Sequence, residues 1–348
     1  MINFFRNIRQ KMLKDGKTIG YLKYAIGEII LVVIGILMAL QVNNWNEHRK
    51  LRLEVKETIG SLKQELEDNI GETNGFVNSG YILGDILRAL KTNGHFERPD
   101  NENFGSFYGD FDLFDTFVRE LNTENLDHWI SLEKDLTSEE KDFLPVVKEL
   151  KKTILERRVW ESKATDLSLQ RFKEFADDLS WFYNTDSLSN LKREQYIKTN
   201  PEFRNKAIHY LNFQLNENVY YGSYIRNLSL IMLWKLKSLE ENKTSANIKD
   251  LLIANHLKPF KSYPCDTSLV MQPESLGFRN SVLVFNATDE LKTFKKIKQN
   301  GASPLNFTLK PNTFYMPSIN ENEYIQEGSD CKTRYAPVKY GFLVLENN

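Results

Sequence analysis

The chain has 348 residues, which at about 150 residues per domain corresponds to roughly two domains. It carries 46 Lys and Arg against 47 Asp and Glu, so its net charge of -1 excludes a strongly basic nucleic-acid binder and an acidic-tail protein. With 41% hydrophobic residues it is not disordered as a whole, and two cysteines exclude a cysteine-dense small scaffold.

Residues 25–42 form an apolar run whose only ionisable group is Glu28. As a helix these residues would span roughly 27 Å, close to the ~30 Å hydrocarbon core of a bilayer. Tyr21 and Tyr24 on one side and Trp45 on the other suit interface anchors. We therefore predict a transmembrane helix over residues 24–42; the alternative is a buried core helix.

Charge around this helix predicts its orientation. Residues 1–23 hold six Lys or Arg residues and residues 43–57 hold four, which favours a cytoplasmic N-terminus. The run ends without a small-x-small cleavage site, so we expect an uncleaved anchor in a bacterial inner membrane with the following residues in the periplasm. Residues 1–23 are either an interfacial helix or a basic tail that only sets topology.

The N-terminal sequence also carries a recognisable signature. MINFFRNIRQKML followed by YAIGEIILVVIGILMALQVNNWNEHRK resembles a bacterial family of uncharacterised single-pass membrane-anchored proteins, a domain of unknown function, with the signature YAIGEIxLVVIGILxALQxNNWNE. The resemblance is close over residues 1–50. It implies an inner-membrane anchor and an extracytoplasmic helical domain, and it supplies no activity and no catalytic residues.

Two features inside the predicted anchor have chemical meaning. Glu28 is either a functional intramembrane acid or a side chain that reaches the interface and sets the depth of the helix. Gly35 and Ala39 form a small-xxx-small pair that allows close helix packing. The partners implied are membrane lipid and either another protein or a second copy, through the transmembrane and first soluble helix; no nucleic acid is implied.

Helical periodicity dominates residues 43–245 and predicts an antiparallel helical bundle outside the cytoplasm. The expected helices cover residues 43–73, 76–90, 104–121, 137–179 and 201–241, and residues 184–200 are expected to form a loop. Thr137 to Glu140 is a capping box, and Asn200-Pro201 is a helix start. The aromatic stripe with Phe104, Phe107, Phe111 and Phe114 is expected to be core, with a ligand pocket as the alternative.

Residues 259–348 alternate short apolar runs with turn residues and predict a small all-β module, a sandwich or a barrel. Cys265 and Cys331 both lie in this module and form a possible disulfide if it faces an oxidising compartment; two separate buried thiols are the alternative. Lys292, Lys295, Lys296 and Lys298 predict a charged edge strand that deters edge-to-edge pairing. The fold class is thus mainly α, with a transmembrane helix, a helical bundle and a C-terminal β module.

The sequence contains no motif that predicts catalysis, a cofactor or a metal site. The leading hypothesis is a non-catalytic envelope protein with a helical sensing or scaffolding domain and a β binding module. A second is a hydrolase that uses acids and His128 in the helical domain. A third is a subunit of a larger membrane complex whose helices meet Glu28, Gly35 and Ala39.

Overall fold

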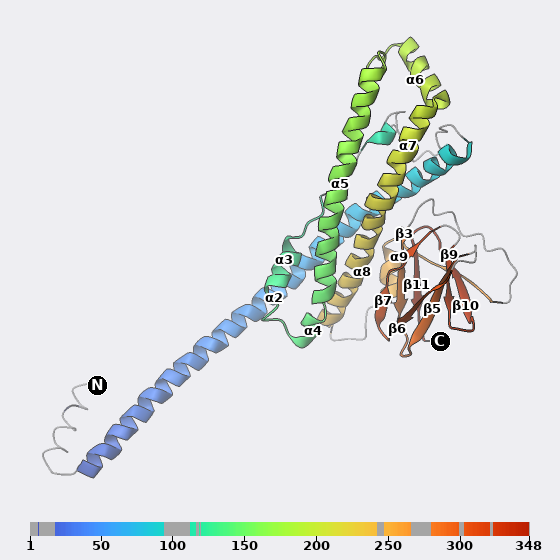
Figure 1. Ribbon diagram of the computed structural model, residues 1–348. Helices are drawn as coiled ribbons and strands as arrows, with labels where there is room; N and C mark the ends of the chain where they lie inside the picture. Colours follow the sequence, from blue (N-terminus) through green and yellow to red (C-terminus); the bar gives the residue numbers. More distant parts are fainter. Residues whose placement is uncertain are drawn as a thin grey trace. The chain divides into compact units, whose positions relative to one another are not determined.

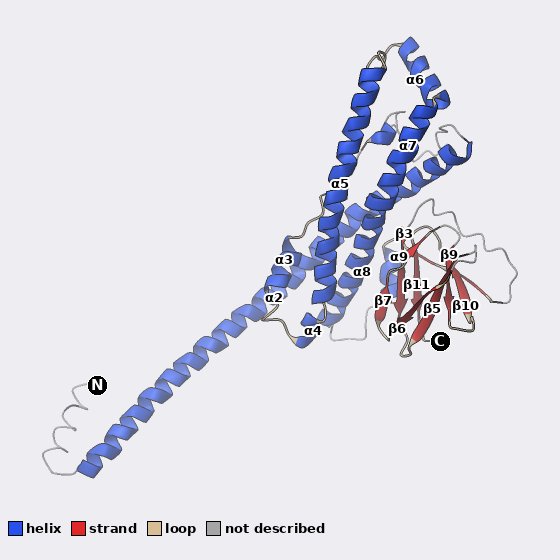
Figure 2. Cartoon of the chain, viewed as in Figure 1, coloured by secondary structure: helices blue, strands red, loops and turns tan. Residues whose placement is uncertain are grey.

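The structure is a computed structural model. It describes residues 6, 18–93, 112–115, 118, 120–241, 247–265, 280–298, 303–320 and 323–347. The chain divides into two compact units, Met1–Thr58 and Ile59–Asn348, which are described separately. The fold is mainly helical, with strands gathered in the C-terminal part, as the sequence predicts (Figure 2).

The first described helix, α2, runs without interruption from Thr18 to Asn93. The expectation of two helices separated near residue 75 was wrong. Gly71, Gly75 and the Asn and Thr residues around them lower helix propensity, but α2 continues through them because Ile70, Phe76 and Val77 are buried against the rest of the unit. No proline lies within α2, and it ends at Asn93, directly before Gly94.

The second unit contains the helical bundle (Figure 1). Its helices after α2 are α3 (Glu124–Ser131), α4 (Ser138–Lys141), α5 (Leu144–Asp178), α6 (Ser187–Thr199), α7 (Pro201–Phe213), α8 (Tyr220–Glu241) and α9 (Ile248–Ala254). A 3₁₀ turn, η2, spans Asp112–Phe114, and a π-helical turn, η3 (Gln214–Val219), joins α7 to α8. α5 packs antiparallel against α7 and α8, which confirms the predicted bundle.

Helix caps explain where several of these helices begin. The predicted capping box is present: Thr137 accepts from the backbone of Glu140, and the Glu140 side chain accepts from Thr137. It caps the short α4, however, and α5 begins separately with Pro145 in its first turn. The expected loop at residues 184–200 was wrong, because Asp186 caps α6 through the backbone N–H groups of Leu188 and Ser189.

The aromatic stripe is only partly helical and only partly described. Phe104, Phe107 and Phe111 lie outside the described residues. Phe114 ends the 3₁₀ turn and is fully buried, whereas Val118 is 62% exposed. The helix expected through residue 121 is therefore wrong in this part, while the expected core position of Phe114 is correct.

Two glycines mark where α2 closely approaches α8 and the π-helical turn η3. An ideal Cβ on Gly222 would lie 2.6 Å from Cδ1 of Phe76, and one on Gly80 would overlap the side chain of Val219. Glycine is needed at both positions because a side chain would push α2 away from α8 and η3. Sequence periodicity did not single out either residue.

We expect Gly222→Ala to destabilise the protein by about 1–3 kcal/mol, because its methyl group overpacks against the Phe76 ring. Gly71→Ala is the matched control: a Cβ there has no neighbour within 4 Å, so alanine should stabilise α2 by up to about 1 kcal/mol. Urea unfolding of the full-length protein in detergent measures both. Equal effects of the two substitutions would contradict the close-packing argument.

The strands form a four-stranded sheet, a five-stranded sheet and a two-stranded pair, β3–β8. The four-stranded order is β1-β11-β4-β7, with β1–β11 and β11–β4 parallel, and the five-stranded order is β2-β10-β9-β5-β6, all antiparallel. Their bounds are β1 Lys258–Pro259, β2 Lys261–Tyr263, β3 Asn280–Ser281, β4 Leu283–Asn286, β5 Lys292–Lys298, β6 Leu305–Leu309, β7 Thr313–Tyr315, β8 Ser318–Ile319, β9 Glu323–Glu327, β10 Thr333–Ala336 and β11 Gly341–Leu345. Trp234 of α8 packs edge-on against Phe285 of β4 at 5.0 Å between ring centroids, so helices and strands share buried surface.

The lysine-rich strand β5 is not an edge strand, contrary to expectation. It lies between β9 and β6, and two of its lysines share an acidic partner on β9. Glu323 of β9, buried at 2% side-chain exposure, lies 3.2 Å from Nζ of Lys296 and 3.6 Å from Nζ of Lys298. Lys296 and Lys298 therefore form ion pairs with Glu323 inside the sheet.

Glu323 gives a pH-dependent prediction. Burial favours its protonated form, but the backbone N–H of Asn320 and the ammonium of Lys296 outweigh burial and hold its pKa below the usual value. Its stabilisation is therefore present above the unfolded pKa of about 4.3 and is lost as pH falls through the lower folded pKa. We expect Glu323→Gln to cost about 1–3 kcal/mol at pH 7.

The difference from wild type should shrink as unfolding is measured at successively lower pH from 7 to 3. Glu290→Gln is the control, because that side chain is 76% exposed beside Lys292 and should leave the urea midpoint almost unchanged. A Glu323→Gln defect of constant size across this pH range would contradict the assigned pKa.

Candidate functional site

The first candidate site is the exposed apolar stretch of α2. An 18-residue apolar window lies within the helical span Ala25–Thr92, and none of it is buried in the protein. Leu31 is 74% exposed and Val42 is 64% exposed. By length and composition α2 can cross a membrane, which would remove this apolar surface from water.

The residues singled out from the sequence lie along this stretch as follows. Glu28 is half-buried, while a Cβ on Gly35 would meet nothing within 4 Å; Ala39 follows one turn later on the same face. Trp45 is 64% exposed, with the guanidinium of Arg49 5.8 Å from its ring centroid. Tyr21 and Tyr24 belong to α2, but their side chains lie outside the described residues.

A disulfide joins Cys265 to Cys331, with their Cα atoms 5.9 Å apart. Cys265 follows β2, and Cys331 lies in the turn between β9 and β10. The bond closes a chain separation of 66 residues. Such a cross-link contributes about 4 kcal/mol when the loss of unfolded-chain entropy is the main term.

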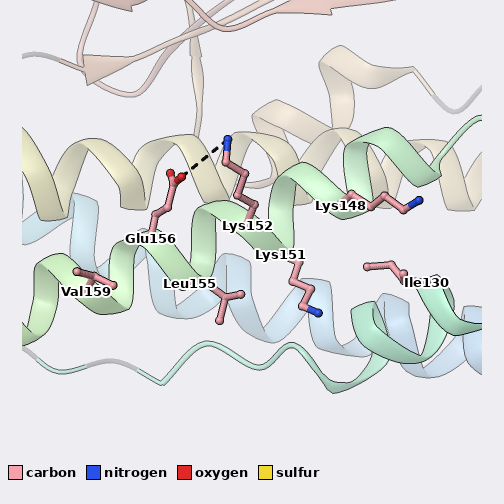
Figure 3. Close-up of a pocket in the computed structure, with 7 residues that line it drawn as sticks. All are labelled: Ile130, Lys148, Lys151, Lys152, Leu155, Glu156 and Val159. Carbon is pink, nitrogen blue, oxygen red and sulfur yellow. Dashed lines mark ion pairs between the residues drawn. The ribbon is translucent and has the colours of Figure 1, made fainter.

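A shallow groove of about 530 Å³ lies along α5 and reaches α3 (Figure 3). Its apolar lining includes Leu155 and Val159, which are 43% and 54% exposed. The remaining lining residues are Ile130, Lys148, Lys151, Lys152 and Glu156. The groove combines an apolar floor with a charged rim.

The lysines of the groove are engaged by acids of the same unit. Lys148 contacts Glu133 at 2.9 Å, Lys151 pairs with Asp127, and Lys152 lies 3.8 Å from Glu156. These partly exposed pairs contribute little stability and leave the rim close to neutral. The groove therefore offers apolar contact area without a strong preference for a charged ligand.

The acids of the helical domain have structural partners. Glu65 of α2 accepts from the backbone N–H groups of Asn125 and Leu126 at 2.8 and 3.3 Å and so fixes the start of α3. Burial raises the pKa of Glu65 above its usual value, against the opposing effect of these hydrogen bonds. His128 lies on the exposed side of α3, and within the described part of the chain no group of three or more His, Cys, Asp or Glu side chains could hold a metal ion.

Two buried arginines were not singled out from the sequence. Arg157 of α5 and Arg226 of α8 are each 1% exposed. Arg157 bonds Glu161 four residues later, a spacing visible in the sequence. Arg226 gives no comparable signal: no acid lies three or four residues from it, and it stands two residues before the run LSLIMLW.

Comparison with known proteins gives one match. A family of unknown function (DUF6090) matches residues 28–77, which include most of the apolar run and the part of α2 that follows it. No curated protein and no solved structure matches the chain. The chain is thus similar over this segment to an uncharacterised family, in agreement with the resemblance found at its N-terminus.

Proposed function

We propose that the chain is a non-catalytic protein anchored in a bacterial inner membrane by residues 25–42. In this proposal the N-terminus is cytoplasmic and the unit beginning at Ile59 is periplasmic, where the helical bundle and β module bind or scaffold a partner. The observation that carries it is the apolar window of α2, none of which is buried in the protein. Water is a poor solvent for such a surface, whereas a bilayer core matches its length.

The disulfide supports the proposed side of the membrane. Disulfides persist in the periplasm and are rare in the reducing cytoplasm, and Cys265–Cys331 lies in the second unit. The excess of basic residues before the apolar run favours the same orientation. The partly exposed apolar groove on α5 is consistent with a binding role.

Cysteine labelling of intact cells tests the topology. A membrane-impermeant maleimide should label Ser162→Cys, an exposed position on α5, and should fail to label Gln10→Cys until the cells are opened. Labelling in the reverse pattern would overturn the orientation.

Alkaline extraction of membranes tests the anchor. Wild type should remain with the lipid, whereas the double variant Val33→Arg/Ile36→Arg should be released, because each central arginine opposes insertion more strongly than several aliphatic residues favour it. Release of the wild type would overturn the proposal.

A second candidate role is that of a subunit in a larger membrane complex. The open space beside Gly35, on a helix whose apolar surface is exposed, favours close approach of another helix. Native mass measurement in mild detergent should then find an oligomer or a co-purifying protein that Gly35→Leu weakens. A strict monomer would rule against this role.

A further inference from the structure

Arg226 is a buried cation without an acidic partner. Its side chain lies where α8 meets β3, and its exposed fraction is 1%. Among the described residues its one hydrogen bond runs from Nη2 to Oδ1 of Asn227 at 3.4 Å, and Nε and Nη1 have no partner there. No carboxylate of the described residues forms an ion pair with it; the groups that interact with it electrostatically are the phenols of Tyr81 and Tyr340.

Burying a guanidinium without a carboxylate partner is unfavourable in free energy. A guanidinium stays protonated in proteins, so Arg226 cannot avoid the cost of burial by losing its charge. Buried charges are as a rule paired and hydrogen-bonded. Arg157 follows that rule, since its Nη2 donates to Oε1 of Glu161 at 2.8 Å. Arg226 has the same burial and lacks such a carboxylate.

Polar groups next to Arg226 are also without partners. Within the part of the chain that the structure describes, the hydroxyls of Ser229, one turn further along α8, and of Ser281 in β3 make no hydrogen bond, nor does Oδ1 of Asn280. β3 is fixed against α8 because Asn227 donates to the carbonyl of Ser281 at 3.1 Å. One cation, two hydroxyls and one amide oxygen thus lie together in the interior without the bonds that buried polar groups normally make.

Tyr81, one of the phenols that interact with Arg226, links α2 to the turn before β11. Tyr81 of α2 accepts from the backbone N–H of Tyr340 at 2.8 Å, and its ring lies 5.6 Å from Nζ of Lys339. Lys339 shares Asp85 with Arg88, at 3.1 and 3.2 Å. Lys339, which contacts the Tyr81 ring, is therefore held against α2 by an ion pair with Asp85.

Tyr340 covers the site in an unusual backbone conformation. Its φ of 59° is left-handed, which is uncommon for a non-glycine residue. The T-shaped contact of its ring with Tyr81, at 4.4 Å between centroids, holds it in place. Strained residues of this kind concentrate at ligand sites, and this turn is the part of the enclosure with the least regular structure.

We propose that Arg226 is the central residue of an oxyanion-binding site enclosed by α2, α8, β3 and the turn that carries Tyr340. An oxyanion would accept hydrogen bonds from Arg226, Ser229 and Ser281, and a hydroxyl on the same ligand would donate to Oδ1 of Asn280. Hydrogen phosphate is the simplest anion that carries both. The ligand class is therefore inorganic phosphate or a small hydroxylated phosphate or carboxylate, and this inference is independent of the membrane anchor.

Calorimetric titration of the full-length protein in detergent, at constant ionic strength, tests the proposal. Inorganic phosphate should bind wild type at one site, at least tenfold more tightly than sulfate, which has no hydroxyl at neutral pH. Titration with glycolate and with acetate identifies whether a hydroxylated carboxylate is also accepted. Absence of phosphate and glycolate binding up to 20 mM, or equal binding of phosphate and sulfate, would overturn the proposal.

Two variants locate the site. Arg226→Gln should weaken phosphate binding at least tenfold, whereas Lys192→Gln, which removes one charge from the exposed side of α6, should leave it unchanged. If Arg226→Gln does not fold, Ser229→Ala provides the measurement and should weaken binding several-fold. Binding that Arg226→Gln, or Ser229→Ala in its place, leaves at the wild-type value would lie elsewhere and would contradict the assignment.

Discussion

Replacing Glu161 with leucine should lower the free energy of unfolding by about 3–5 kcal/mol, the usual cost of removing one partner of a buried ion pair. The two side chains are 2% and 10% exposed, and Oε1 of Glu161 lies 2.8 Å from Nη2 of Arg157. The remaining guanidinium keeps its charge, because arginine does not deprotonate in proteins. Its contact with the ring of Phe76, at 4.6 Å from the centroid, cannot replace a carboxylate.

The double variant Arg157→Met/Glu161→Leu separates charge from packing. It removes both charges and keeps apolar volume, so it should recover most of the stability lost in Glu161→Leu. Urea unfolding of the three proteins in the same detergent measures the difference. If the double variant were less stable than Glu161→Leu, packing of the Arg157 methylene groups would matter more to stability than the charge left uncompensated in Glu161→Leu.

Local signals in the sequence were sufficient for several elements. The apolar run predicts the exposed stretch of α2, and Asn200-Pro201 predicts the start of α7, where Asn200 accepts from the backbone of Glu202 and Phe203. Each depends on residues within one or two helical turns. The strands expected in the C-terminal part were also found, because short runs between turn residues are a local pattern.

The failures involve contacts between distant residues. The place of β5 between β9 and β6, and the parallel pairing of β1 with β11, depend on residues far apart in the chain. Whether a charged residue is buried is likewise decided by its neighbours in space: nothing local distinguishes Arg226, which meets β3, from an arginine on a solvated helix face. α6 was missed because most of its surface is polar, and Asp186 as its cap was the available signal.

Phe114→Ala should cost about 3–5 kcal/mol, since the residue is fully buried in an aromatic cluster. Its ring centroid lies 5.3 Å from Phe175, 5.8 Å from Phe203 and 5.4 Å from Tyr210. Alanine would leave a cavity between α5 and α7 that these rings cannot fill without leaving their present packing.

The loss at Phe114 should also loosen the short segment that carries it. The hydroxyl of Tyr210 donates to the carbonyl of Asp115 at 3.0 Å, so the ring and the hydrogen bond together fix η2 to α7. Val118→Ala is the matched control, because Val118 is 62% exposed four residues later and its truncation should change stability by less than about 0.5 kcal/mol. Comparable urea midpoints for the two variants would contradict the core position of Phe114; a large loss confined to Phe114→Ala is the result that this packing requires.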